Sequence, residues 1–301
     1  MKEIVYKLLN PFHTILGHNQ ELIMALRYKK KMGRKIDLDH PTLFHDKILW
    51  MEFRTDTSLW TELADKYRVR SFVAKRVGNE ALNELYGVYG SVEEIDYSRL
   101  PQSFVLKTNN GCASHIIVRD KATANLAEIN RNMRYFLNLH FGELTGQPHY
   151  TGIKPLIIAE KLMVQDGDSS LPLNDYKFNC FNGVPVCCHA FTDRQLYTHN
   201  VSEMIYDMDW NAHPEYYDQS NAGLHLSTDA QKMPACFDEM KRIAAKLSQG
   251  FPFVRVDLYD IDGRPVFGEM TFTPGLDTYY TLEFQRRLGD MIDLTLCKPK
   301  K

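Results

Sequence analysis

The chain has 301 residues, 44% of them apolar and 25% charged, which is the balance of a globular protein large enough for two or three subdomains. Its formal net charge of −2 gives no overall positive field, so nucleic acid is not expected as a partner. Six cysteines without a C-x-x-C pair predict reduced thiols rather than a disulfide framework. No apolar run reaches the roughly 18 residues of a membrane-spanning helix, and Pro11 and Gly17 interrupt the segment where a signal peptide would have its core. We therefore expect a cytoplasmic protein.

A run of basic residues lies near the N-terminus, at residues 27–35, and reads Arg-Tyr-Lys-Lys-Lys-Met-Gly-Arg-Lys. One interpretation is the solvated end of a helix. The other is a patch that contacts a phosphorylated or lipid-linked partner, which would place the protein at the inner face of the membrane. Both interpretations stay open at this point.

The pattern of apolar and polar residues predicts three consecutive segments, at 1–100, 101–165 and 166–301. The first is mostly helical. Leu22, Ile23 and Leu26 share one helix face, and a second amphipathic stripe is formed by Trp60, Leu63, Ala64 and Tyr67. Residues 64–78 are predicted to form one helix that Gly78 ends.

The second segment is predicted to contain a strand at 103–107, a small polar turn at 108–114 and a return strand at 115–118. A helix at about 121–139 follows, and then a buried strand at 155–162.

The third segment is richest in strands. Residues 176–181 and 184–191 are predicted to pair through the turn Asn182-Gly183. After a helix at about 237–249, residues 253–259 and 265–272 form a second hairpin around 260–263. The elements predict α+β architecture rather than regular βαβ alternation.

The second hairpin carries the clearest chemical pattern. Arg255 and Asp257 alternate with apolar residues on one strand, and Glu269 and Thr271 share a face of the other. If the turn centres on Asp262-Gly263, Asp257 and Glu269 can lie side by side. Two adjacent carboxylates repel unless a cation lies between them, and Mg²⁺ binds through one or two carboxylates plus phosphate oxygens. The alternative is an ordinary exposed hairpin face.

Two further stretches suit a nucleotide. Lys107 ends a strand before the turn Thr108 to Ser114, whose backbone N–H groups can point at phosphate oxygens. Glu160, Lys161 and Leu162 end a hydrophobic strand, where backbone groups can bind a purine edge between apolar walls. Taken alone, each stretch is equally an ordinary turn or strand end.

In combination and order, these stretches resemble ATP-grasp enzymes, and more specifically the TupA-like ATP-grasp family, which is associated with bacterial teichuronopeptide and surface-polysaccharide biosynthesis. The resemblance is carried by residues 64–70, 100–107, 157–161, 175–183, 206–210, 250–259 and 268–275. It implies an ATP-grasp fold, with a helical N-terminal region (1–100), a lid subdomain (101–165) and a C-terminal catalytic subdomain (166–301) that clasp ATP.

The resemblance also implies roles for individual residues. ATP would contact Lys66, Lys107, Asn110, Gly111, Ser114, Glu160, Lys161 and Leu162. Mg²⁺ would be bound by Asp257, Glu269 and Thr271, the last standing where many ATP-grasp enzymes have Asn. The catalytic set would be Arg255, Lys107 and Lys177, with Arg255 on the transferring γ-phosphoryl group.

The implied activity is that of an ADP-forming carboxylate–amine ligase. It would make an amide through an acylphosphate and attach an amino acid or small amine to a sugar acid, free or lipid-linked, during synthesis of a capsule or other cell-envelope polysaccharide. Arg194 and His189 are the candidate substrate contacts. The alternatives are an ATP-grasp kinase acting on a sugar hydroxyl and a glycosyltransferase. Asp207-Met-Asp209 matches the Asp-x-Asp motif of glycosyltransferases but lacks the βαβ context of that motif.

Overall fold

The computed structural model describes residues 2–165, 167, 171–192, 202–218, 226, 231–276 and 279–300. Contacts divide the chain into two compact units. Unit 1 combines Met1–Arg27, Thr57–Phe72 and Asn83–Leu162, and unit 2 combines Tyr28–Asp56, Val73–Leu82 and Met163–Lys301. The three consecutive segments inferred from the sequence stay a prediction.

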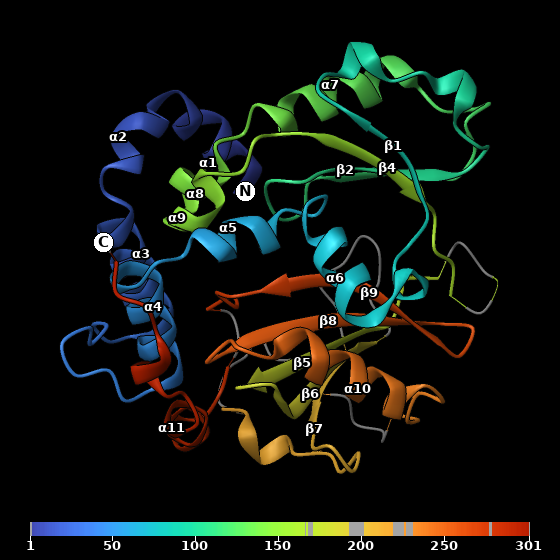
Figure 1. The fold of residues 1–301 in the computed structure, drawn as a ribbon. Coiled ribbons are helices and arrows are strands. Elements are labelled where there is room, and N and C mark those ends of the chain that lie inside the picture. Colours follow the sequence, from blue (N-terminus) through green and yellow to red (C-terminus); the bar gives the residue numbers. More distant parts are fainter. Residues whose placement is uncertain are drawn as a thin grey trace. The chain divides into compact units, whose positions relative to one another are not determined.

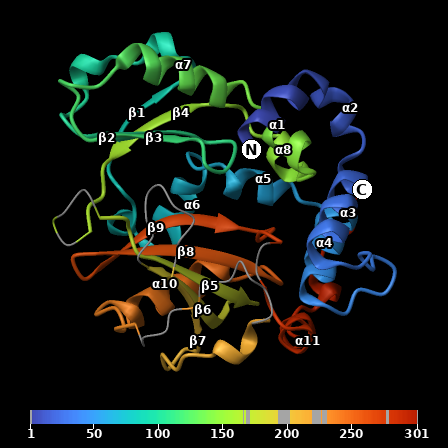
Figure 2. The same cartoon turned by 180° about the vertical axis from the view of Figure 1, so that it is seen from behind.

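Unit 1 contains a four-stranded antiparallel sheet in the order β1-β4-β2-β3. The strands are β1 (Leu85–Tyr89), β2 (Phe104–Thr108), β3 (His115–Val118) and β4 (Ile157–Lys161). Helix α7 (Leu126–Leu137) packs on β2 and β3, as Figure 1 and Figure 2 show. Strands β2, β3 and β4 lie where the sequence predicts them, whereas β1 lies in a segment predicted to be mostly helical. Every position of β1 is half-buried, so it has no period-two pattern to reveal it.

The remaining helices of unit 1 are short. They are α1 (Lys2–Leu9), α2 (His13–Gly17), α5 (Ser58–Ala64), α8 (Phe141–Thr145) and α9 (Pro148–Thr151), with α3 (Gln20–Met32) and α6 (Val69–Val77) crossing the boundary between the units. The 3-10 helices of the described chain are η1 (Asn10–Phe12), η2 (Asn79–Ala81), η3 (Val92–Glu94), η4 (Tyr97–Arg99), η5 (Pro214–Tyr216) and η6 (Leu294–Leu296).

Two helix predictions need correction. In place of one helix at 64–78, α5 ends at Ala64 and α6 begins at Val69, and in the turn between them the Asp65 carboxylate accepts hydrogen bonds from the backbone N–H groups of Tyr67 and Arg68. The helix predicted from about residue 121 begins at Leu126, where the Asn125 side chain caps it. Leu22 and Leu26 share a face of α3, as the sequence predicts, and their side chains are 57% and 61% exposed.

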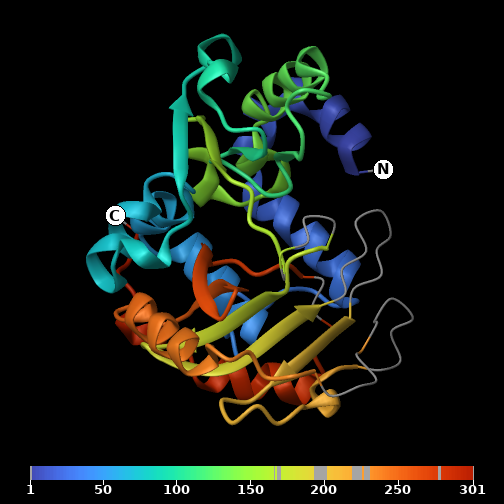
Figure 3. The ribbon, with the colours of Figure 1, turned by 90° about the vertical axis from the view of Figure 1, so that its right-hand side faces the viewer.

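Unit 2 contains a five-stranded antiparallel sheet in the order β7-β6-β5-β8-β9. The strands are β5 (Asp175–Phe181), β6 (Val184–Thr192), β7 (Ser202–Tyr206), β8 (Val254–Ile261) and β9 (Arg264–Thr271). Helix α10 (Phe237–Ser248) lies along one face, and Figure 3 shows it against the strands. The Phe178 and Phe237 rings stack there with centroids 5.7 Å apart. Apolar alternation and this helix therefore leave the opposite face for polar side chains.

Both predicted hairpins of unit 2 are present. Asn182 and Gly183 have φ of 50° and 85°, and Asp262 and Gly263 have φ of 54° and 75°, the positive values that a two-residue hairpin turn requires. Strand β9 carries one extra residue, Gly268, between the pairs Leu258–Phe267 and Asp257–Glu269. A side chain at this bulge would begin 2.9 Å from the Tyr259 ring, so a residue without Cβ fits best.

Two more helices of unit 2, α4 (Phe44–Arg54) and α11 (Leu282–Asp290), pack against each other. Across their contact the buried His45 Nδ1 lies 3.2 Å from the Gln285 side-chain oxygen. None of the described helices is long and apolar enough to cross a membrane.

Candidate active site

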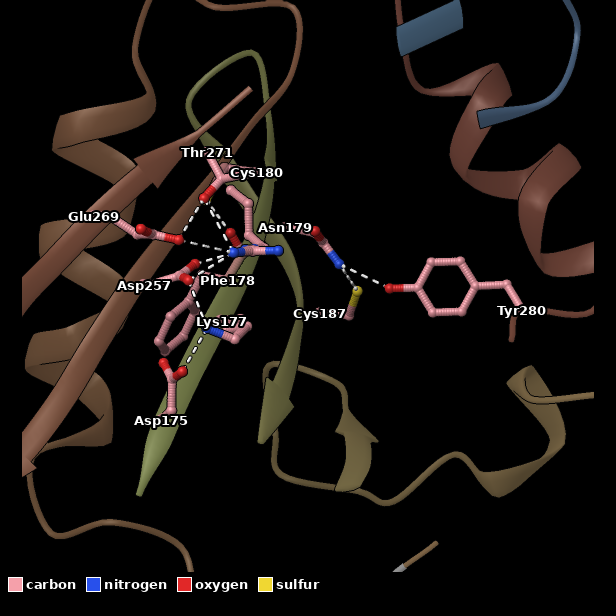
Figure 4. A network of polar contacts seen from close by, with 11 residues as sticks. Asp175, Lys177, Phe178, Asn179, Cys180, Cys187, Asp257, Glu269, Thr271 and Tyr280 are labelled. Carbon is pink, nitrogen blue, oxygen red and sulfur yellow. Dashed lines mark hydrogen bonds and ion pairs between the residues drawn. The ribbon is translucent and has the colours of Figure 1, made fainter. Parts of the chain in front are cut away.

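The polar face of the unit 2 sheet brings together most of the residues that the hairpin pattern singled out. Antiparallel pairing sets Lys177 beside Asp257 and Asp257 beside Glu269, in one row across β5, β8 and β9. The next row sets Arg255 beside Thr271. Figure 4 shows the side chains of Asp257, Glu269 and Thr271 gathered on this face. Arg255 bonds to all three of them, so the sequence prediction of a shared face is confirmed.

Asp257 is the centre of the cluster. Its side chain is buried and receives two bonds from Arg255, from Nε to Oδ1 at 2.6 Å and from Nη2 to Oδ2 at 2.7 Å. The Lys177 ammonium lies 2.6 Å from Oδ2 and 2.5 Å from Asp175 Oδ2. One carboxylate is thus held by two cations, and a second carboxylate shares the lysine (Figure 4).

This arrangement keeps the cluster ionised. Burial would raise the pKa of Asp257, but Arg255 and Lys177 hold it below its ordinary value. Burial would likewise lower the pKa of Lys177, but Asp175 and Asp257 raise it. The buried charges therefore stabilise one another.

Glu269 differs from Asp257 because it reaches the surface, with a side chain that is 37% exposed. One of its oxygens, Oε1, lies 3.3 Å from Arg255 Nη2 and accepts a hydrogen bond from the Thr271 hydroxyl at 3.0 Å. That hydroxyl also accepts from Arg255, at 3.0 Å.

The donor set suits one kind of metal site. No group of three or more His, Cys, Asp or Glu side chains that could hold a metal occurs in the described part of the chain. A cage made only of protein ligands is therefore not formed there. The two neighbouring carboxylates, Asp257 and Glu269, fit Mg²⁺ bound jointly with phosphate oxygens.

In unit 1, Lys107 and Glu160 form the core of a second charged cluster. Their strands pair so that Val105 lies opposite Glu160, which puts Lys107 diagonally across from the carboxylate. Lys107 Nζ lies 2.8 Å from Glu160 Oε2, and Arg70 Nη1 lies 2.9 Å from Oε1. One buried carboxylate is therefore shared by two partly exposed cations.

Hydrogen bonds from Asn109 and Lys66 hold the turn after Lys107 in place. The Asn109 side chain accepts from the Leu156 backbone at 2.7 Å and donates to the Lys154 carbonyl at 3.0 Å. Lys66 donates from its ammonium to the Gly111 carbonyl and from its backbone to the Asn109 carbonyl. The structure thus brings Lys66 to the turn with which the resemblance associated it.

Two hydroxyls in this turn, those of Thr108 and Ser114, are buried and have no hydrogen-bond partner within the described chain. Buried polar groups are normally satisfied, so this turn keeps unused hydrogen-bonding capacity. Asn110 is buried beside them, and a Cβ on Gly111 would lie 3.0 Å from the Phe141 ring. The close fit against Phe141 favours glycine at that position.

At the end of β4, the Lys161 side chain is exposed and its carbonyl accepts from the Asn83 side chain at 2.8 Å. Leu162 is half-buried directly after the strand. Glu160 points into the Lys107–Arg70 ion pairs, so only backbone groups are left for a purine edge.

His189 is buried on β6, in register with Lys177. Its Nε2 lies 2.5 Å from the Tyr217 hydroxyl and 3.3 Å from Glu203 Oε2. Neither partner was singled out from the sequence. Arg194, the other candidate substrate contact, lies outside the described residues.

Two more site residues were missed. Asp175 could have been found, because it precedes Lys177 by two residues and so shares its face. Arg70 could not, since it lies on α6 and reaches Glu160 only through the tertiary fold.

The model of one protein family, TupA-like ATP-grasp, matches residues 46–293, which is most of the chain. The chain belongs to this family. The resemblance drawn from the motifs is confirmed, and the α+β elements described above are those of an ATP-grasp fold.

Among solved structures, the chain is similar to the D-alanine–D-alanine ligase of Bacillus anthracis complexed with ATP, with 13% identity and a TM-score of 0.46 over 79% of this chain and 66% of that one. It is also similar to the ATP-grasp ligase PsnB complexed with its minimal precursor, with 13% identity, a TM-score of 0.41 and coverage of 76% and 61%. It is similar as well to the D-cycloserine synthetase DcsG, with 17% identity and a TM-score of 0.42 over 79% of this chain and 71% of that one. The TupA-like chain thus spans less than two thirds of the length of the first two. No curated protein sequence matches it.

Proposed function

We propose that this TupA-like ATP-grasp protein is an ATP-dependent ligase that joins a carboxylate to an amine and releases ADP and phosphate. The observation that carries the proposal is the Arg255–Asp257–Glu269 cluster on the polar face of the unit 2 sheet, in a chain of this family. It combines a cation suited to a transferring phosphoryl group with carboxylates suited to Mg²⁺.

The proposed reaction has two steps. A carboxylate oxygen of the acid attacks the γ-phosphorus of ATP, the bond to the β-phosphate oxygen breaks, and ADP leaves with an acylphosphate formed. The amine nitrogen then attacks the acyl carbon, phosphate leaves with the electron pair, and the nitrogen loses a proton to give the amide. Phosphoryl transfer needs positioning and charge neutralisation more than covalent chemistry. A site of lysines, an arginine and carboxylates meets that need.

The chain's own residues then divide the work. Lys107, Lys66 and the 108–114 turn are proposed to bind the nucleotide phosphates, with the end of β4 beside the adenine. Arg255 is proposed to stabilise the γ-phosphoryl group, and Lys177 to hold Asp257 ionised and in place. Glu269 and Asp257 would hold Mg²⁺, which supplies Lewis-acid polarisation of the phosphate oxygens when bound.

The acid and the amine are proposed from the family association: a uronic or other sugar acid, free or lipid-linked, and an amino acid or small amine. His189 is buried, so its proposed role is to orient Tyr217 and Glu203 and not to touch substrate. Glu203 is the member of this group that reaches solvent, with a side chain 17% exposed.

Product analysis tests the reaction class. The protein is incubated with ATP, Mg²⁺, a panel of sugar acids and a mixture of amino acids. The ligase predicts ADP and phosphate only when acid and amine are both present, with a product mass equal to acid plus amine minus water. ADP with a phosphorylated sugar and no need for amine would replace the ligase by a kinase.

Glu269→Gln tests the metal assignment within the same assay. The change keeps the side-chain shape but removes the charge, so Mg²⁺-dependent turnover should fall by at least about 100-fold, the scale on which loss of one electrostatic contact to the transition state is felt. Lys154→Gln, at an exposed position outside the cluster, is the control. Turnover of Glu269→Gln near that of the parent protein would rule out this carboxylate as a metal ligand.

A further inference from the structure

The first helices of the chain expose an unusual amount of apolar surface. Half of the exposed large apolar side chains in the described residues lie between Val5 and Leu26. Among them, Leu8 is 67% exposed and Ile15 is 63% exposed. Scattered single apolar residues are normal on a protein surface, but such a concentration marks an interaction site.

Part of the surface of α2 and α3 packs on the rest of unit 1. α2 packs on α8, and Gly17 lies against the Glu143 side chain. At the start of α3, Met24 is buried and lies beside Gly146. In α3 the exposed apolar residues thus lie opposite the buried Met24, whereas η1 and α2 have no buried residue.

In α3 the exposed apolar side chains lead directly into basic ones. Leu22, Leu26 and Lys30 follow one another at intervals of four residues and so lie on one helix face, with Lys29 beside them. The buried residue Tyr28 points to the other side. This face thus has an apolar part followed by a cationic part.

The structure also sorts the basic run 27–35 into two groups. Arg27 donates to the Thr145 carbonyl, and Arg34 donates to Asp46 and to the Tyr28 hydroxyl, so both hold the fold together. Lys29, Lys30 and Lys35 are exposed, and none of them makes an ion pair within the described chain. Three lysines are therefore available to a partner.

The charge of the chain is strongly uneven. Residues 1–35 contain eight Lys and Arg against two Glu, whereas the other 266 residues contain 28 Lys and Arg against 36 Asp and Glu. A negatively charged surface would therefore attract the first region and repel the rest.

We propose that the exposed side chains of α1, α2 and α3 dock on an anionic lipid bilayer. The exposed apolar side chains would enter the boundary between headgroups and acyl chains, and Lys29, Lys30 and Lys35 would lie at the lipid phosphates. Apolar side chains flanked by flexible lysines are the pattern of helices that lie in a membrane surface. This docking does not depend on the proposed ligase reaction.

Vesicle flotation tests the docking. The full chain is mixed with vesicles of phosphatidylcholine alone or of phosphatidylcholine with phosphatidylglycerol, at about 0.1 M salt, where the screening length is about 10 Å. We expect the protein to float with the anionic vesicles and to stay behind with the neutral ones. Absence of binding to anionic vesicles would overturn the proposal.

Two variants assign the two parts of the surface. The charge variant replaces three lysines: Lys29→Gln, Lys30→Gln and Lys35→Gln. It should weaken partitioning into anionic vesicles by more than tenfold, since each basic residue near such a surface is worth about fivefold. Its control removes the same charge elsewhere: Lys75→Gln, Lys232→Gln and Lys246→Gln. Equal losses in the two variants would show that only net charge matters and would contradict a specific face.

The apolar variant is Leu8→Ser, Phe12→Ser and Ile15→Ser, and its control changes exposed apolar residues of unit 2: Met233→Ser, Leu282→Ser and Leu296→Ser. Only the first should lose vesicle binding. The competing possibility is that these side chains join two copies of the chain. Light scattering of the parent protein in solution measures its oligomeric state and so tests this. A dimer that the apolar variant alone dissociates would assign this face to a second copy of the chain and overturn the membrane proposal.

Discussion

The two charged clusters of the molecule are built in opposite ways. In unit 1, Glu160 lies between Lys107 and Arg70, so one carboxylate meets two cations. In unit 2, three carboxylates meet two cations. The first cluster has a surplus of positive charge and the second a surplus of negative charge.

This difference indicates what each cluster still needs. A surplus cation at the root of a turn with unused donors suits an anion such as a phosphate. A surplus carboxylate, with Glu269 reaching the surface, suits a cation. Each cluster is therefore complementary to an ion of the opposite charge. The clusters also differ in burial, and the following predictions use both differences.

The largest effect is expected for Asp257→Asn. The amide keeps the shape but leaves Arg255 and Lys177 buried without their shared counter-charge, so the free energy of unfolding should fall by about 3–5 kcal/mol. Denaturant unfolding measures this, with Glu269→Gln as the matched control in the same cluster. Because Glu269 is 37% exposed, its change should cost less than about 1 kcal/mol. Equal losses would contradict the division into a buried and a surface carboxylate.

The next effect concerns acid, to which unit 2 should respond through His45. Burial is the main cause that lowers the pKa of this histidine from 6.5 to about 4 in the folded chain. Between these values the unfolded chain binds the proton more tightly, so the free energy of unfolding should fall by about 3 kcal/mol as pH drops from 6.5 to 4. His45→Gln should remove this pH dependence. If the free energy of unfolding of that variant still falls with pH as in the parent protein, the acid sensitivity belongs to other groups.

A smaller loss is expected for Glu160→Gln in unit 1. The Lys107 and Arg70 side chains are 27% and 17% exposed, so water can partly replace the lost carboxylate. The free energy of unfolding should fall by about 1–2 kcal/mol, well below the value for Asp257→Asn. A loss as large as that of Asp257→Asn would erase the contrast between the clusters.

The smallest predicted effect separates anion from cation binding. Lys107→Met should weaken ATP binding measured without Mg²⁺ by about tenfold, because it removes a charge-assisted contact to phosphate. Glu269→Gln should leave Mg²⁺-free binding unchanged and weaken only the gain in affinity that Mg²⁺ provides. Titration calorimetry with and without Mg²⁺ makes both measurements. Equal weakening by both variants without the metal would show that the clusters are not specialised.

Local patterns predicted much of the fold and part of the site. Asn182-Gly183 and Asp262-Gly263 located two hairpins, because positive φ at both turn positions favours these residues. Strict alternation placed Arg255 and Asp257 on one face. What local pattern could not supply was tertiary: Arg70 joins Glu160 from a helix, and the exposure of Leu22 depends on which side of α3 the rest of unit 1 occupies.

The pairing of Asp257 with Glu269 lies between these cases. Counting back from the turn at Asp262-Gly263, a regular ladder would place Gly268 opposite Asp257 and Glu269 opposite Val256. The bulge at Gly268 shifts the ladder by one and brings the two carboxylates together. The sequence predicted the right pair, but the turn position alone would not have produced it.

Because of the bulge, β9 can lose one residue at this point without a change in which residues pair with β8. Because Gly268 is the residue without a partner, a chain shortened by that one residue would still present Glu269 opposite Asp257 and Phe267 opposite Leu258. Removal of Met270, two positions away, would instead move Thr271, the last residue of the strand, to the other face. In alignments of related chains, a one-residue gap in this strand therefore belongs at Gly268. A gap placed elsewhere would pair the wrong residues with the carboxylate site.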